Sequence, residues 1–210
     1  MLITNIVCSL IAFALGAIPS AYIIVKYFSG KDIRKLGTGN VGAMNSYEVT
    51  NKKWIGLVVF LMDFIKGLLA VFIARYLGGN NLQTVLLAAI FAVLGHNYNP
   101  FLKFKGGRGL AVACGVLIPI NLLIIIFWVL MWLTGYYAIK RDVHVGNIVA
   151  SIGAAILLFR APEKIIHIFA TMNIYDISTF RNASIFLCFL ILLRHSDVIL
   201  EIFKKNKNMD

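Results

Sequence analysis

Residues 109–139 read GLAVACGVLIPINLLIIIFWVLMWLTGYYAI, a run that contains no charged side chain. One straight helix of this length would span about 46 Å, whereas the hydrocarbon core of a bilayer is about 30 Å thick. Pro119 lies within the run, and a proline inside a helix removes a hydrogen bond and bends the chain. We therefore predict two apolar helices, 109–118 and 120–139, with a reversal between them.

The composition of the whole chain places these helices in a membrane. Of 210 residues, 60% are apolar and 14% are charged, and the mean hydropathy is +0.85. This composition excludes a disordered chain and a soluble nucleic-acid-binding domain, and it argues against a soluble enzyme. We predict an all-α polytopic membrane protein with about seven transmembrane helices, the third and fourth being short. The predicted apolar runs are 5–25, 54–75, 82–95, 109–118, 120–139, 146–159 and 182–199.

The whole chain, 1–210, is expected to form a single integral-membrane domain with a basic C-terminal tail at 200–210. No basic residue precedes the first apolar run, so we expect an uncleaved span rather than a signal peptide.

Basic residues divide unequally between the two sides that this arrangement defines. The net charge is +11. Fifteen bases fall in alternate loops on one side: Lys26, Lys31, Arg34, Lys35, Lys52, Lys53, Lys103, Lys105, Arg108, Lys140, Arg141, Arg194, Lys204, Lys205 and Lys207. The other side has four, namely Arg75, Arg160, Lys164 and Arg181. The positive-inside rule then places the N-terminus outside and the C-terminus in the cytoplasm of a multi-pass plasma-membrane protein.

Metal and disulfide chemistry have no support in the sequence. Cys8, Cys114 and Cys188 lie in apolar stretches without paired spacing, and the four histidines are scattered. We expect no metal, no cofactor and no nucleic-acid partner. A His-x-x-x-x-Asp pair and a Gly-x-Ser-x-Gly turn are both absent from the sequence, so no acid–base residue or nucleophile is assigned.

The first polar segment is rich in glycine and lies on the basic side. Glycines allow positive φ and close backbone approach, and successive N–H groups can then converge on an anion. No strand is expected before this segment, so a dinucleotide-binding fold is excluded. The alternative is a flexible loop with helix caps. The candidate phosphate-binding residues here are Gly37, Thr38, Gly39, Asn40, Gly42 and Asn45.

The second polar segment ends in a Gly-Gly-Arg-Gly turn that opens into the next apolar helix. A helix N-terminus with flanking cations is a suitable oxyanion site, and arginine adds a bidentate fork for phosphate. The alternative is a basic turn that grips lipid headgroups. The candidate residues are Lys105, Gly106, Gly107, Arg108 and Gly109.

Ionisable residues inside the spans form a third, supporting set. Asp63 and Lys66 are three residues apart, so they share one helix face and can pair. Ionisable groups within a span normally face the bundle interior. A purely structural pair is the alternative. His96 directly follows the run 82–95. His195 lies at the end of the last span, where a histidine is often only a partner of the helix dipole.

These segments resemble the bacterial integral-membrane acyl-phosphate:glycerol-3-phosphate acyltransferases. The matching stretches are 37–45 (family pattern GSGNxGATN), 63–67 (DxxKG), 95–109 (GHxxPxFLxFKGGKG) and 193–197 (a late RHxxN segment). The resemblance covers the chain to about residue 206 and identifies it as a divergent member. It implies transfer of a fatty acyl group from acyl phosphate to the 1-hydroxyl of glycerol-3-phosphate, which gives lysophosphatidate and phosphate on the cytoplasmic face. It also implies that a substrate phosphate oxygen takes the hydroxyl proton.

The chain departs from the family pattern at several positions. Thr38 replaces serine and Arg108 replaces lysine, so the hydroxyl and the charge are kept, whereas Glu48 stands where the family has a substrate-binding arginine. The other departures are Met44, Pro100, Val112, His144, Val198 and Lys207. They leave two alternatives: a weak or inactive relative that binds phosphorylated lipid precursors or regulates an active copy, and a small transporter.

Overall fold

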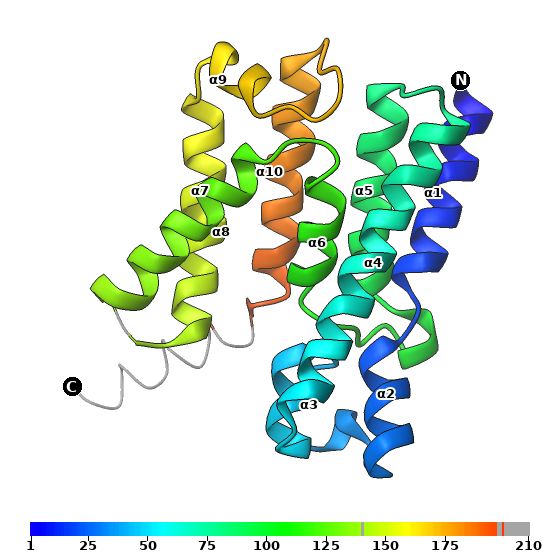
Figure 1. The fold of residues 1–210 in the computed structure, drawn as a ribbon, viewed down its shortest axis with the longest axis vertical. Coiled ribbons are helices and arrows are strands. Elements are labelled where there is room, and N and C mark those ends of the chain that lie inside the picture. The colour runs from blue at the N-terminus through cyan, green and yellow to red at the C-terminus, as the bar shows by residue number, and fades with distance from the viewer. Residues whose placement is uncertain (140, 197–198, 200–210) are drawn as a thin grey trace.

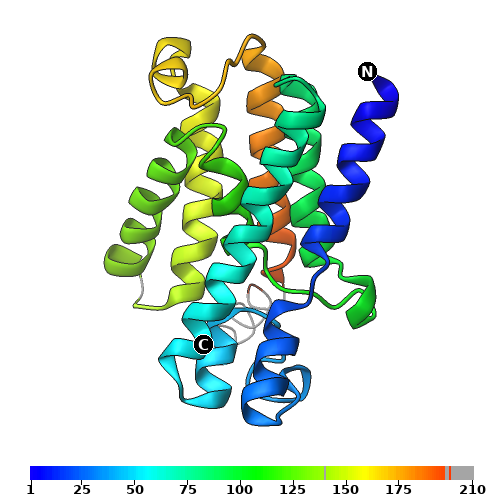
Figure 2. The same ribbon diagram turned by 45° about the vertical axis from the view of Figure 1, so that its right-hand side comes forward.

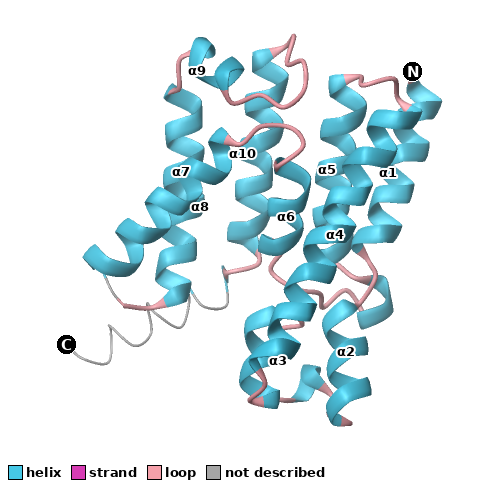
Figure 3. Cartoon of the chain, in the orientation of Figure 1, coloured by secondary structure: helices cyan, strands magenta, loops and turns pink. Residues whose placement is uncertain are grey.

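The computed structural model describes residues 1–139, 141–196 and 199. Figure 3 shows helices joined by loops throughout this part of the chain, which confirms the all-α fold. The helices are α1 (Leu2–Gly16), α2 (Ser20–Ser29), α3 (Ala43–Thr50), α4 (Lys53–Leu77), α5 (Leu82–Asn97), α6 (Leu110–Leu117), α7 (Leu123–Thr134), α8 (Val143–Arg160), α9 (Glu163–Ile168) and α10 (Ile177–Leu193). Short helical turns occur at η1 (Ile33–Lys35), η2 (Pro100–Leu102) and η3 (Gly135–Ile139).

Each predicted apolar run overlaps at least one helix; the last helix, α10, begins and ends about five residues before the predicted run 182–199. Four segments of the described chain are long and apolar enough to cross a membrane: Leu2–Ser29, Lys53–Leu77, Leu82–Leu102 and Val143–Arg160. Leu123–Ile139 and Ile177–Leu193 are apolar but shorter, and α6 has only 8 residues. The predicted number of about seven crossings stays a prediction.

The predicted break after α6 is confirmed. α6 ends at Leu117 and α7 begins at Leu123. Asn121 is fully buried in the turn; its Oδ1 accepts from the N–H of Leu123 at 2.8 Å, and its Nδ2 donates to the carbonyl of Ile166 at 2.8 Å. A buried asparagine therefore satisfies the backbone where the two helices part.

A second break, which the sequence analysis did not predict, interrupts the first apolar run. α1 ends at Gly16, and α2 begins after Pro19. The break leaves carbonyl oxygens without helical partners. Asn99 Nδ2 donates to the carbonyl of Ala17 at 2.6 Å, and Lys66 Nζ donates to that of Ile18 at 3.0 Å. Polar side chains from elsewhere in the bundle thus replace the missing helical hydrogen bonds.

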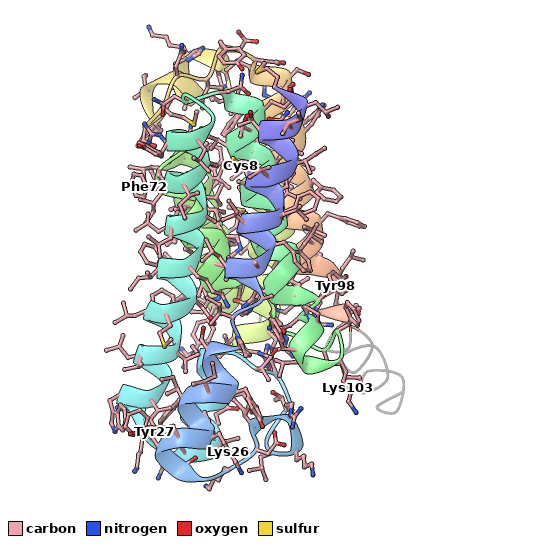
Figure 4. The ribbon with its side chains drawn as sticks, turned by 90° about the vertical axis from the view of Figure 1, so that its right-hand side faces the viewer. Cys8, Lys26, Tyr27, Phe72, Tyr98 and Lys103 are labelled. Atoms are coloured by element: carbon pink, nitrogen blue, oxygen red, sulfur yellow. The ribbon has the colours of Figure 1, made fainter. Side chains whose placement is uncertain are left out.

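Connections that alternate along the chain lie at opposite ends of the bundle. α2, α3 and the connections 30–42, 98–109 and 141–142 lie in the half opposite the N-terminus, whereas α9 and the connections 78–81 and 118–122 lie in the half that contains it (Figures 1 and 2). In Figure 4, Lys26 and Lys103 lie in the half away from the N-terminus, and Cys8 lies near it. This alternation agrees with the predicted grouping of the loops; the side that each end faces stays a prediction.

The short helix α6 lies against α4 near the centre of the molecule (Figure 1). Gly115 and Gly67 allow this approach, because a methyl group on Gly115 would overlap the carbonyl of Phe64, and one on Gly67 would come within 2.5 Å of the carbonyl of Val112. Small residues let helix backbones approach closely inside a membrane. The N-terminal end of α6 is thereby placed beside the polar residues of α4 and α5.

Candidate active site

Two cavities of opposite character meet at the end of the bundle that carries α2 and α3. The first, which we name the apolar groove, has a volume of about 340 Å³ and is lined largely by aliphatic and aromatic residues of α6, α7 and α10. The second, the polar cleft, has a volume of about 510 Å³ and is lined by Arg34, Thr38, Gly39, Asn40, Lys105, Gly106, Arg108, Leu193, Arg194 and Ser196. Asn40 and Arg108 line both cavities. The two cavities therefore share a boundary that carries a guanidinium.

The first glycine segment is folded around Asn45. The side chain of Asn45 is buried; its Oδ1 accepts from the N–H of Thr38 at 3.0 Å, and its Nδ2 donates to the carbonyl of Asn40 at 2.8 Å. The φ angles of Gly37 and Gly39 are +58° and +70°, as the pattern predicted. Gly42 is instead extended, with φ −132°, and it precedes α3. Asn45 therefore holds the loop in shape and does not line either cavity.

The backbone N–H groups of this loop were expected to converge on an anion, but those of Gly39 and Asn40 have acceptors within the loop. The N–H of Gly39 donates to the carbonyl of Leu36 at 3.0 Å, and the N–H of Asn40 donates to Oγ1 of Thr38 at 3.4 Å. These amides are satisfied inside the loop. Thr38, Gly39 and Asn40 of this loop line the polar cleft.

The Gly-Gly-Arg-Gly turn is held from both sides. The N–H groups of Gly106 and Gly107 each donate at 3.1 Å to the last turn of α5, at the carbonyls of Asn97 and His96. Arg194 donates to the carbonyls of Gly106 and Gly107 at 2.7 and 3.1 Å. The N–H groups of Gly106 and Gly107 are therefore occupied. The turn instead presents Arg108, which is half-buried, and the exposed Lys105.

Asp63, Lys66 and His96 form one buried cluster below this turn. Lys66 Nζ lies 2.9 Å from Asp63 Oδ1 and 3.0 Å from His96 Nδ1, and it also donates to the carbonyl of Ile18. An ammonium has three hydrogens to donate, and Lys66 directs its charge to an ion pair with Asp63 and to contacts with His96 and the carbonyl of Ile18. The geometry favours the structural reading of Lys66, whereas Asp63 and His96 line the apolar groove.

Arg108 contacts α8 across the mouth of the apolar groove. Its NH1 lies 3.0 Å from Nδ1 of His144, whose ring packs edge-on to that of His195 at 6.4 Å between centroids. His195 is fully buried and donates through Nδ1 to the carbonyl of Ile191 at 2.8 Å. Asn147 Nδ2 lies 3.4 Å from Nε2 of His195. His195 therefore supports the wall behind the groove and lines neither cavity.

Arg34 is a cation of the polar cleft that sequence reasoning missed. It donates to both carboxylate oxygens of Asp32, at 2.9 and 2.7 Å, and its guanidinium lies 4.6 Å from the ring centroid of Tyr22. The hydrogen bonds from Arg34 lower the pKa of Asp32 to about 2. Glu48 is exposed on α3 and lines neither cavity. Nothing in the sequence distinguished Arg34 from the other loop bases.

The predicted site residues fall into two groups, those that line a cavity and those that do not. Thr38, Gly39, Asn40, Lys105, Gly106 and Arg108 line the polar cleft, and Asn40, Gly42, Asp63, His96, Arg108 and Gly109 line the apolar groove. Gly37, Asn45, Lys66, Gly107 and His195 line neither cavity. The cleft residues Arg194 and Ser196 and the groove residues His144 and Asn147 were not predicted. Val198 and Lys207 lie outside the described residues.

Comparisons with known proteins agree on one family. Residues 6–205 match the family model described as glycerol-3-phosphate acyltransferase. The chain is 42% identical over 148 residues to glycerol-3-phosphate acyltransferase 2 of Moorella thermoacetica, covering 70% of this chain and 74% of that protein. It is 31% identical to a Helicobacter pylori glycerol-3-phosphate acyltransferase over 91% of this chain and 88% of that one. It also resembles the crystal structure of PlsY (YgiH), an integral membrane glycerol 3-phosphate acyltransferase in its glycerol 3-phosphate form, with TM-score 0.77, 31% identity and coverage of 96% and 92%.

Proposed function

This chain belongs to the glycerol-3-phosphate acyltransferase family, and we propose that it transfers a fatty acyl group from acyl phosphate to the 1-hydroxyl of glycerol-3-phosphate. The products are lysophosphatidate and inorganic phosphate. A relative of known structure is described in glycerol 3-phosphate and lysophosphatidic acid forms, which supports this acceptor and this lipid product.

The observation that carries the proposal is the shared boundary of the two cavities at Asn40 and Arg108. An acyl phosphate has a long apolar chain and a charged head, so it fits a groove that ends at a guanidinium. Glycerol-3-phosphate is small, polar and anionic, and the polar cleft with Arg34, Lys105 and Arg108 suits it. The reacting carbonyl and hydroxyl groups then meet at the boundary.

Two helix N-termini support a phosphate at this boundary. Residues 42–44, where α3 begins, and residues 109–111, where α6 begins, both line the apolar groove. The first N–H groups of a helix have no helical acceptors and carry a partial positive charge, so they favour anions. We assign the head of the acyl phosphate to this position, beside Arg108.

The proposed reaction needs no covalent intermediate, because an acyl phosphate is already activated. The 1-hydroxyl oxygen attacks the carbonyl carbon, an ester bond forms, and the bond between the carbonyl carbon and the phosphate oxygen breaks. The hydroxyl proton passes to an oxygen of the leaving phosphate. The protein contributes proximity of the two substrates and positive charge beside the departing phosphate, from Arg108 and the helix N-termini.

The orientation in the membrane follows from the same assignment. Glycerol-3-phosphate is water-soluble, and the polar cleft lies at the end of the bundle that carries α2 and α3. Most of the basic loops lie at that end. We propose that it faces the cytoplasm, with the N-terminus outside, and that the chain is a multi-pass protein of the plasma membrane.

An assay in proteoliposomes tests the proposal. Purified protein is supplied with palmitoyl phosphate and radiolabelled glycerol-3-phosphate, and lipid and phosphate are extracted. We expect labelled lysophosphatidate and an equal amount of released phosphate. Arg108→Ala should lower the rate, whereas Arg160→Ala, an exposed arginine at the far end of α8, serves as the matched control and should not.

Three other outcomes would overturn the proposed reaction. Product formed from acyl-CoA but not from palmitoyl phosphate would replace the donor. Saturable binding of labelled glycerol-3-phosphate without any product would indicate the non-catalytic binding role. Label that accumulates inside the vesicles without acyl phosphate would indicate a transporter.

A further inference from the structure

His144 touches Arg108, a cation that lines both cavities. Its Nδ1 lies 3.0 Å from NH1 of Arg108, and its side chain lines the apolar groove. A guanidinium has donors only, so the imidazole nitrogen in this contact is the acceptor. His144 must therefore be neutral while the contact exists, with its ring hydrogen on Nε2.

Contacts to both the backbone and the ring of His144 hold the residue in place. Asp142 Oδ1 accepts from the N–H of His144 at 2.8 Å and from that of Val145 at 3.1 Å, which fixes the first turn of α8. On its other side the ring packs against His195, which is fully buried. Nδ1 of His144 thus belongs to a residue fixed in the first turn of α8, whereas Arg108 extends from the turn that precedes α6.

We propose that His144 is a positioning residue that holds the Arg108 guanidinium at the boundary of the two cavities. The proposal rests on the proposed function, in which Arg108 stabilises charge on the leaving phosphate. One N–H of the guanidinium faces Nδ1 of His144, and a guanidinium carries five N–H donors, so it can contact more than one acceptor. Without this acceptor, the guanidinium would lose a contact that orients it, and the phosphate would face a less preorganised donor.

A double-mutant cycle separates positioning from packing. His144→Leu removes the acceptor, and we expect kcat to fall about ten- to a hundredfold, the range for one hydrogen bond to a charged group. The KM for glycerol-3-phosphate should change less than about threefold, because Arg34 and Lys105 still line the polar cleft. In an Arg108→Ala background, His144→Leu should change kcat by less than about twofold, since no guanidinium remains to be held.

Two further variants serve as a rescue and as a control. His144→Asn keeps an acceptor at the δ position and should restore most of the activity that His144→Leu loses. His167→Leu, an exposed histidine on α9 at the other end of the bundle, is the matched control and should leave activity unchanged. Equal losses from His144→Leu in the wild-type and Arg108→Ala backgrounds, or a His144→Asn enzyme as slow as His144→Leu, would overturn the positioning role.

A readout that needs no turnover keeps this test independent of the proposed function. The ¹⁵N resonances of the His144 ring, identified by their absence from His144→Asn, should show an unprotonated Nδ1 that shifts in Arg108→Ala. An unchanged Nδ1 resonance would overturn the pairing even in an inactive protein. An inactive wild-type protein with a shifted resonance would instead contradict the proposed reaction and leave the pairing supported.

Discussion

Nζ of Lys66 lies 3.0 Å from Nδ1 of His96, and this contact links the middle of α4 to the last turn of α5. Because an ammonium can only donate, Nδ1 of His96 is the acceptor, and the ring hydrogen lies on Nε2. The Nε2 edge packs against Gly107, where any side chain would overlap it. A buried cation thus sets the tautomer of a groove residue and the position of the glycine turn above it.

The buried cluster of Asp63, Lys66 and His96 predicts that one single variant is less stable than a double variant. Asp63→Asn should destabilise the protein by about 3–5 kcal/mol, because it leaves the Lys66 ammonium buried without its counter-ion. Combining Asp63→Asn with Lys66→Met removes that uncompensated charge, so the double variant should be more stable than Asp63→Asn alone. Thermal unfolding in detergent measures the order, with the exposed Glu163→Gln as control. A double variant as unstable as the sum of its single variants would contradict this account.

The break between α6 and α7 was predictable, whereas that between α1 and α2 was not. The run at 109–139 is too long for one span, and a proline marks its middle. The run at 5–25 has an ordinary length for one span, so Pro19 gave no reason to divide it. Its break depends on Asn99 and Lys66, which come from distant parts of the chain and satisfy the freed carbonyls. The spacing of residues within the run 5–25 therefore could not predict this break.

In the candidate site, too, the sequence pattern could not predict which contacts single residues make with distant parts of the chain. The glycine patterns located both polar segments, and most of the chosen residues line a cavity. The pattern could not tell which donors are consumed inside the loops. Asn45 uses its amide on the backbone, and Arg194 uses its guanidinium on Gly106 and Gly107. Likewise, Arg108 and His144 are far apart in sequence and both depart from the family pattern, and only the fold shows that they touch.

The orientation in the membrane can be tested by cysteine labelling. Single cysteines at positions 52, 75, 108 and 164 sample both groups of loops, and the native cysteines Cys8, Cys114 and Cys188 are first replaced. In intact cells, an impermeant maleimide should label positions 75 and 164 only. Labelling of position 108 from outside would reverse the proposed orientation, and permeabilised cells provide the control that every site is reactive.

Arg108 should tolerate lysine better than alanine. Arg108→Ala loses a charge-assisted hydrogen bond to phosphate, worth about 1.5–3 kcal/mol, so kcat/KM should fall roughly ten- to a hundredfold. Arg108→Lys keeps a positive charge near the boundary and should retain much of the activity. Steady-state assays in proteoliposomes measure both. Wild-type activity in Arg108→Ala at normal expression would remove Arg108 from the site.

The pair of Asp32 with Arg34 makes a prediction about pH. Because the pKa of Asp32 is lowered to about 2, its carboxylate stays ionised at neutral pH, and the pairing is lost only as the pH falls through that value. The side-chain carboxyl carbon of Asp32, followed by NMR, should show no titration between pH 5 and pH 8. In Arg34→Gln the midpoint should rise toward the ordinary value of 3.8. A midpoint that Arg34→Gln leaves unchanged would assign the lowered pKa to another cause.

Arg34 and Glu48 should differ sharply in their effect on the acceptor substrate. Arg34 lines the polar cleft and is held by Asp32 and Tyr22, so it offers a preoriented guanidinium to the phosphate of glycerol-3-phosphate. We expect Arg34→Gln to raise the KM for glycerol-3-phosphate by roughly tenfold or more, with the KM for acyl phosphate little changed.

Glu48 is exposed and lines neither cavity, so solvent screens its charge from the cleft. Glu48→Gln should therefore change the same KM by less than about threefold, and added salt should reduce even that effect. The exposed neighbour Lys35→Gln is the matched control for loss of a loop cation outside the cleft. If Glu48→Gln lowered the KM as much as Arg34→Gln raised it, Glu48 would have to face the bound phosphate. The acceptor would then lie on the α3 side of the loop, and the polar cleft would lose its assignment.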